Sequence, residues 1–127
     1  MPKTPIIPAG SAPPLAPYSP GVRAGNTVYV SGMLAIGPGG ETVGVGDVTV
    51  QTRHVLLAIQ AVIEAAGGAM ADIAMNSIFL KDLGDYAAVN AVYAEFFPSE
   101  PPARYCIRAD LVRPDFLVEI ASMAYLA

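Results

Sequence analysis

A single charged residue, Glu119, interrupts an apolar stretch that runs from Phe116 to Leu126. If this stretch is a β-strand, alternation places Glu119 on the same side as Leu117, Ala121 and Met123. An unpaired carboxylate on an apolar surface either costs folding free energy or has its pKa raised. A glutamate that reaches solvent at a strand end is the alternative, but a position near the middle of the stretch favours a functional carboxylate. We therefore expect Glu119 to meet a cation or to take part in a reaction.

Arg104 is a candidate for that cation, and it lies in the preceding predicted strand. Alternation there puts Arg104 and Cys106 on one side of the strand and Tyr105 on the other. A guanidinium grips a planar carboxylate through two parallel hydrogen bonds, so Arg104 could bind a substrate carboxylate. A structural ion pair between Arg104 and Glu119 or another acid is the alternative, because most paired charges stabilise structure.

Other reactive and metal-binding side chains are few. The single Cys106 can form no intramolecular disulfide, and it is predicted to be a small core residue because nothing places His54 beside it. His54 is predicted to pack on a helix. One Cys and one His cannot supply a usual zinc site, and no carboxylate cluster stands ready for a harder cation. Asn76 and Asn90 could each anchor a ligand in a pocket, and the alternative, which we favour, is an amide at a strand end or on a helix surface. We expect no metal and no cofactor.

The elements that position these residues follow from hydrophobic periodicity and from Gly and Pro breaks. Together they predict an α+β fold with one mixed sheet and both helices packed on the same face. Tyr86, Tyr93, Phe96 and Phe97 recur at helical spacing and are predicted to be core. The predicted elements are a strand at 27–31 that resumes at 33–36 after Gly32, a helix at 51–66, a strand at 73–80, a helix that starts after Asp82 or Asp85 and stops before Pro98, and strands at 103–109 and 116–126.

Composition indicates that one sheet face is covered by another copy of the chain. Hydrophobic residues make up 54% of the 127 residues and charged residues 14%, and both sides of the last strand are largely apolar. A small domain cannot bury so much apolar surface within itself. The helices can cover one face of the sheet, so we expect a neighbouring subunit on the other.

The chain is predicted to be one domain, 1–127, with a proline-rich N-terminal arm at 1–20 that holds seven of the twelve prolines. The formal charge of −4 and the lack of a basic run argue against a nucleic-acid partner. No segment has the continuous apolar character of a signal peptide or a membrane span, so we expect no membrane partner and a cytoplasmic protein.

Six short segments, taken together in this order and at this spacing, resemble the Rid/YjgF family of reactive intermediate deaminases. The resemblance extends over the whole chain. Segments 6–10, 51–56 and 76–79 are most similar to the branch of that family that deaminates aminoacrylate in pyrimidine degradation. The six segments are Tyr29-Val30-Ser31-Gly32, Phe79-Leu80-Lys81-Asp82-Leu83, Tyr86-Ala87-Ala88-Val89-Asn90, Tyr93-Ala94-Glu95-Phe96-Phe97, Pro102-Ala103-Arg104-Tyr105-Cys106 and Val118-Glu119-Ile120.

The resemblance implies a chorismate-mutase-like fold and a homotrimer with active sites in clefts between subunits. It also implies that Arg104 binds the substrate carboxylate and that Glu119 orients or activates the attacking water. Many family members have Ser where this chain has Tyr105, which bears on substrate shape. The cleft would be lined by Tyr18, Ser31, Gly32, Asn90 and Cys106.

The implied substrate is a small enamine or imine that carries a carboxylate. The first expectation is hydrolysis of 3-aminoacrylate to malonate semialdehyde and ammonia. The alternatives are a general deaminase of 2-aminoacrylate and other 2-imino acids, and a non-catalytic trimer that binds small carboxylates.

Overall fold

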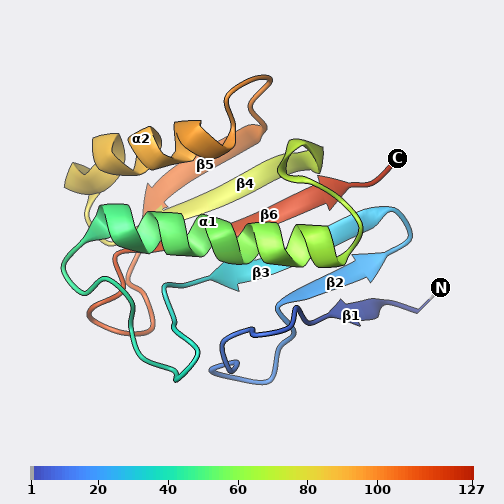
Figure 1. Ribbon diagram of the computed structural model, residues 1–127. Helices are drawn as coiled ribbons and strands as arrows, with labels where there is room; N and C mark the ends of the chain where they lie inside the picture. Colours follow the sequence, from blue (N-terminus) through green and yellow to red (C-terminus); the bar gives the residue numbers. More distant parts are fainter. Residues whose placement is uncertain (1) are drawn as a thin grey trace.

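The computed structural model describes residues 2–127 and contains one six-stranded mixed sheet with two α-helices on one face (Figure 1). The strand order is β1-β2-β3-β6-β4-β5, and every neighbouring pair is antiparallel except β4 and β5, which are parallel. The predicted α+β class with both helices on the same face is confirmed. The strands are β1 Thr4–Ile6, β2 Gly21–Ala24, β3 Thr27–Met33, β4 Ile73–Leu80, β5 Ala103–Arg108 and β6 Val118–Tyr125.

The longer helix, α1, spans Val48–Ala65 and begins one turn earlier than the predicted helix at 51–66. The three residues that open it, Val48-Thr49-Val50, are β-branched and do not favour a helix by themselves. Asp47 overrides that preference as the N-cap, because its carboxylate accepts a hydrogen bond from the Val50 amide at 3.1 Å. At the other end, Gly67 has φ +94° and reverses the chain.

The second helix, α2, spans Tyr86–Phe96 and follows a short 3-10 turn at Leu83–Asp85. Asp85 stands at its N-cap but makes no side-chain capping bond, whereas the Asp82 carboxylate accepts from the Gly84 amide at 2.8 Å and caps the turn. Of the two candidate caps named from the sequence, Asp82 therefore caps the 3-10 turn, and Asp85 holds the N-cap position of α2 without a side-chain bond.

The strands differ from prediction at the N-terminal side of the sheet. Strand β2 was not predicted, because four residues that follow a proline-rich arm are too few to show alternation. The strand predicted at 33–36 does not form. Strand β3 ends at Met33, and Ile36 makes only an isolated bridge with Thr42. The glycine irregularity at Gly32 is confirmed as a register shift between Val30 and Met33.

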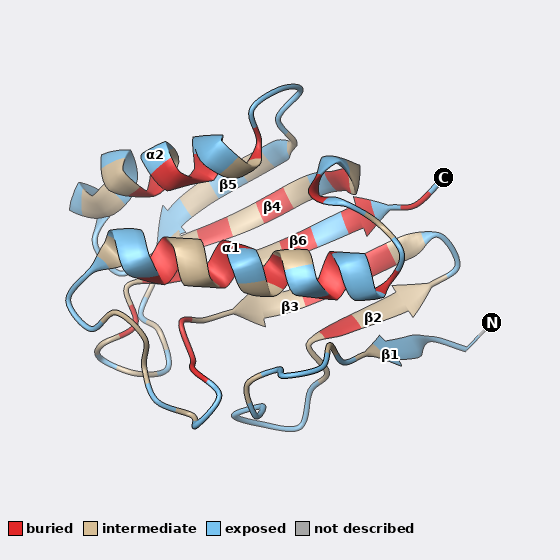
Figure 2. Ribbon diagram, in the orientation of Figure 1, coloured by how far each residue is buried: buried red, intermediate tan, exposed pale blue. Residues whose placement is uncertain are grey.

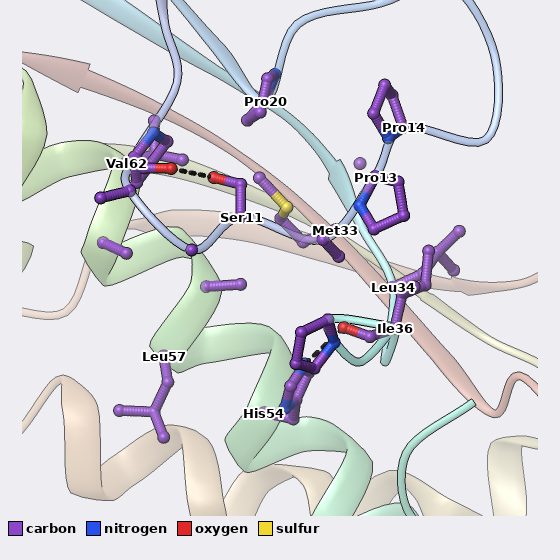
Figure 3. Close-up of a pocket in the computed structure, with 18 of the residues that line it drawn as sticks. Ser11, Pro13, Pro14, Pro20, Met33, Leu34, Ile36, His54, Leu57 and Val62 are labelled. Atoms are coloured by element: carbon purple, nitrogen blue, oxygen red, sulfur yellow. Dashed lines mark hydrogen bonds between the residues drawn. The ribbon is translucent and has the colours of Figure 1, made fainter. Parts of the chain in front are cut away.

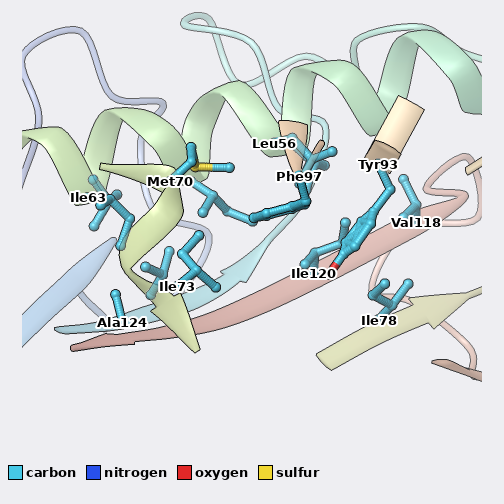
Figure 4. Close-up of a cluster of buried hydrophobic side chains, with 14 of the residues drawn as sticks. Leu56, Ile63, Met70, Ile73, Ile78, Tyr93, Phe97, Val118, Ile120 and Ala124 are labelled. Carbon is cyan, nitrogen blue, oxygen red and sulfur yellow. The ribbon is translucent and has the colours of Figure 1, made fainter. Parts of the chain in front are cut away.

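The core lies between the sheet and the two helices (Figure 4). Along β6, residues at even positions are buried under the helices, while those at odd positions lie on the opposite face and are half-buried or exposed (Figure 2). That opposite face, termed the outer face below, carries exposed apolar side chains that the chain itself does not cover. They are Tyr29, Tyr105, Ile107, Met123 and Tyr125. Within residues 2–127, neither helix is long and apolar enough to cross a membrane.

Candidate active site

Glu119 lies on the outer face of the sheet, and it shares that side with Ala121 and Met123, as alternation predicts. Its cross-strand partner on β4 is Phe79, whose ring makes an edge-to-face contact with Tyr105 at 6.2 Å between centroids. On its other side is β3, where Ser31 and Gly32 together stand opposite the single residue Ala121 in a β-bulge. Glu119 therefore sits on a partly apolar surface between a bulge and an aromatic pair.

Gly32 is the residue that makes room for the Glu119 carboxylate. A Cβ atom at position 32 would overlap Oε2 of Glu119, and its nearest three neighbours would all be atoms of that side chain. No other residue type fits there without moving the carboxylate. The bulge and the glycine together fix where Glu119 can point.

Within residues 2–127, the Glu119 carboxylate has no ion-pair or hydrogen-bond partner. Burial raises the pKa of this carboxyl above its ordinary value, and no nearby cation offsets the effect. An acid whose pKa is raised toward neutrality exchanges protons readily, which suits general acid–base chemistry.

Arg104 points the other way, toward α2. Its Nη2 donates two hydrogen bonds, one to the Tyr86 hydroxyl oxygen at 3.0 Å and one to Oδ1 of Asn90 at 2.7 Å. Its Cζ lies 4.8 Å from the centroid of the Tyr93 ring, a cation–π distance. Three side chains of one helix face therefore hold the guanidinium.

Cys106 lies on the same side of β5 as Arg104, as predicted from alternation, and is partly buried against the core. Burial raises the pKa of its thiol, and the nearby Arg104 charge offsets this only in part. The thiol is therefore the stable form at neutral pH, which agrees with a packing role and not with a thiolate nucleophile.

Strand register places Arg104 and Glu119 on opposite faces of the sheet. Arg104 pairs with Asn76 of β4, and Glu119 pairs with Phe79 of β4. Asn76 and Phe79 are three residues apart, so they point to opposite faces of the sheet, and their partners Arg104 and Glu119 do the same. Because β4 separates β5 from β6, their backbones are also about 10 Å apart. The ion pair between Arg104 and Glu119 that the sequence left open is not formed within the chain.

The predicted site residues therefore fall into two groups. The arginine group is Asn90, Arg104 and Cys106, between β5 and α2. The glutamate group is Tyr18, Ser31, Gly32 and Glu119, around the β3 bulge. Ser31 joins the arm to that bulge, since its Oγ donates to the Ser19 carbonyl at 2.5 Å and its amide to the Pro20 carbonyl at 3.0 Å.

Sequence reasoning missed the part that Tyr86 and Tyr93 play around Arg104, because both were assigned to the core. That assignment is correct for Tyr93, which is buried and accepts a hydrogen bond from Nδ2 of Asn76 at 2.9 Å. It is wrong for Tyr86, which is 45% exposed. Tyr86 is the first residue of α2 and lies on the same helix face as Tyr93, so helical periodicity groups the two and gives no sign of their different exposure. Asn76 is a buried structural residue that bonds Tyr93 and Ser122.

A cavity of about 350 Å³ lies between the arm and α1, beside the glutamate group (Figure 3). Its walls come from segment 8–14 of the arm and from Leu57, Ala58 and Ala61 of α1, and Tyr18 and Gly32 reach its edge. His54 lines it with Nε2 2.9 Å from the Ile36 carbonyl, so Nε2 is the donor and carries the proton. No Lys, Arg, Asp or Glu among the described residues lines this cavity, so a carboxylate would find no counter-charge there.

The described part of the chain, 2–127, contains no group of three or more His, Cys, Asp or Glu side chains that could hold a metal ion. The charged side chains of the arrangement are one guanidinium held for a planar anion and one carboxylic acid of raised pKa.

Comparison with known proteins places the chain in a family. The profile of the family described as Endoribonuclease L-PSP matches residues 9–126. The chain belongs to this family, which includes the Rid/YjgF proteins, and the resemblance seen in the sequence is confirmed.

Individual relatives cover nearly the whole chain. A protein of Acinetobacter baylyi named 3-aminoacrylate deaminase RutC is 53% identical over 126 residues, which span 99% of this chain and 100% of that protein. Among solved structures, the Rid family protein YyfA of Yersinia pestis is 31% identical, with a TM-score of 0.90 and 98% and 99% of the two chains covered. TdcF of E. coli with bound serine is 33% identical, with a TM-score of 0.86 and coverage of 98% and 100%.

Proposed function

We propose that the chain is a deaminase that hydrolyses 3-aminoacrylate to malonate semialdehyde and ammonia. The observation that carries the proposal is the full-length, 53% identity to a protein named for that activity. The residues fit the reaction, because the substrate is a small enamine with one carboxylate and the chain holds one guanidinium and one proton-exchanging acid.

The reaction needs no group beyond these side chains and water. The enamine takes a proton at the carbon next to the carboxylate and gives up one from its nitrogen, which leaves an imine. Water then adds to the imine carbon, one proton moves to the nitrogen, and ammonia leaves as the carbonyl forms. Arg104 would hold the carboxylate, so that positioning supplies much of the rate. Glu119 would deliver the carbon-bound proton as an acid or accept a proton from the attacking water as a base.

The site would be completed between copies of the chain. Arg104 and Glu119 face away from each other across β4, so one small substrate cannot reach both within one chain. A homotrimer, in which the arginine group of one copy meets the glutamate group of the next, would join the two halves in three equivalent clefts. The exposed apolar side chains of the outer face give such an assembly a surface to bury.

A carboxylate ligand also has support from a structural relative. TdcF was solved with bound serine, a three-carbon compound with one carboxylate. Arg104 is the cation that would bind such a group here, since Asn90 and Tyr93 hold its guanidinium at the edge of the sheet.

The proposal is tested by ammonia release from 3-aminoacrylate and, separately, from 2-aminoacrylate, each generated in place by an upstream enzyme. Both compounds hydrolyse spontaneously, so a reaction without protein and a reaction with Arg104→Ala serve as controls. Faster release from 3-aminoacrylate by the wild type alone would support the proposal. Much faster turnover of 2-aminoacrylate would replace it with the general 2-imino acid activity, and equal rates in all three reactions would favour a carboxylate-binding protein.

The family is described as Endoribonuclease L-PSP, so cleavage of RNA is a second activity to test. The formal charge of −4 and the lack of a basic run give an RNA backbone little to bind. A titration with single-stranded RNA at two salt concentrations should show no salt-dependent binding.

A further inference from the structure

Arg104 has no free N–H on Nη2. This nitrogen carries two hydrogens, and both are donated within the chain, one to the Tyr86 hydroxyl and one to Oδ1 of Asn90. The hydrogens that remain for a ligand are the two on Nη1 and the one on Nε.

A two-point grip on a carboxylate needs Nη2. The guanidinium presents parallel N–H pairs along only two edges, one formed by Nη1 with Nη2 and the other by Nε with Nη2. Nη1 and Nε do not share an edge with parallel hydrogens. As long as both Nη2 hydrogens are occupied, Arg104 can offer a carboxylate only separate single bonds, so a bidentate grip requires that one partner give way.

Tyr86 is the weaker of the two partners. Its bond to Arg104 is longer, at 3.0 Å against 2.7 Å for Asn90, and it is exposed whereas the Asn90 bond is partly buried. The Tyr86 side chain is 45% exposed, so water can replace the guanidinium as its partner. Both residues come from α2, which runs alongside β5 (Figure 1), and loss of the Tyr86 bond leaves Asn90 and the Tyr93 ring still holding the guanidinium.

We propose that Tyr86 is a positioning residue whose hydroxyl holds Arg104 in the empty site and gives up its N–H to the substrate carboxylate. This inference rests on the proposed function, in which Arg104 binds that carboxylate. Tyr86 then competes with the substrate for one edge of the guanidinium and sets how tightly carboxylates bind. Tyr86→Phe removes the competitor and keeps the aromatic ring, whose centroid lies 5.6 Å from Cζ of Arg104.

The test is a titration with acrylate, a three-carbon carboxylate that lacks the amino group, followed by NMR shifts of the folded protein. Tyr86→Phe should bind acrylate about threefold to tenfold more tightly than the wild type, because one exposed hydrogen bond no longer has to break. Acrylamide, the neutral analogue, should show no such difference. Thr49→Val, which removes an exposed hydroxyl from the first turn of α1, should bind acrylate like the wild type. With 3-aminoacrylate, Tyr86→Phe should lower KM and leave kcat unchanged.

Unchanged or weaker acrylate binding in Tyr86→Phe overturns the inference, and weaker binding would make the hydroxyl a carboxylate donor. Acrylate binding that survives Arg104→Ala also overturns it, because the ligand would then lie elsewhere. A third result separates the two proposals: the wild type binds acrylate through Arg104, Tyr86→Phe binds it more tightly, and neither protein deaminates 3-aminoacrylate. In that case the proposed function fails and the role of Tyr86 stands.

Discussion

The arginine group and the glutamate group carry the two charged side chains of the candidate site, and the chain surrounds them differently. Arg104 has two hydrogen-bond acceptors and an aromatic ring, all from α2. Glu119 has no polar partner among residues 2–127, and a glycine in a bulge keeps its space open. One charge is held in place by side chains, and the other has no side-chain partner within the described residues. A binding group gains from fixed geometry, whereas an acid that must exchange protons gains from a pKa that its surroundings have raised.

The largest expected effects come from removing either charge, and the two variants should fail in different ways. Arg104→Ala should lower kcat/KM about a hundredfold or more, mainly through KM, because the carboxylate loses its charged partner. Glu119→Gln should lower kcat by about a hundredfold or more with KM little changed, because proton transfer is lost. Steady-state ammonia release, corrected for spontaneous hydrolysis, measures both. If the two variants changed KM and kcat in the same proportions, the division of roles between the two groups would be wrong.

A smaller effect is expected from Gly32→Ala, which fills the space that the carboxylate uses. The new methyl group would overlap Oε2 of Glu119 and push the carboxylate aside, while the backbone at Gly32 is one that alanine can adopt. We expect about a tenfold loss of kcat with little loss of stability. Gly39→Ala, at an exposed turn, is the matched control and should keep wild-type kcat. An unchanged kcat in Gly32→Ala would show that the position of the carboxylate does not matter.

The smallest effect concerns stability and follows from the raised pKa of Glu119. When the native pKa is above the unfolded value, the unfolded chain loses its proton first as pH rises, so ionisation of Glu119 destabilises the native state at neutral pH. Glu119→Gln should therefore unfold at a higher temperature than the wild type at pH 7. The difference should shrink to nothing below about pH 4, where the carboxyl is protonated in both states. A variant that is less stable than the wild type at pH 7 would mean that Glu119 is paired with a cation in the assembled protein.

The same two groups show what the sequence could and could not predict. Alternation alone assigned Arg104 and Cys106 to one side of their strand, and Glu119 to the same side of its strand as Met123, because the period of a strand is a local property. It could not tell that Arg104 and Glu119 face opposite ways, since that depends on the registers by which β5 and β6 each pair with β4. Tyr86 was misassigned because periodicity places it on the same helix face as Tyr93 and cannot show that the first residue of α2 is exposed.

The central claim is that one copy supplies Arg104 and a neighbouring copy supplies Glu119 to each site. Arg104→Ala and Glu119→Gln, produced together with different tags and purified as mixed assemblies, test it directly. In a trimer that contains both variants, one of the three sites combines the intact arginine of one copy with the intact glutamate of the next, so about a third of wild-type ammonia release should return. Mixed assemblies no more active than either variant alone would contradict the claim.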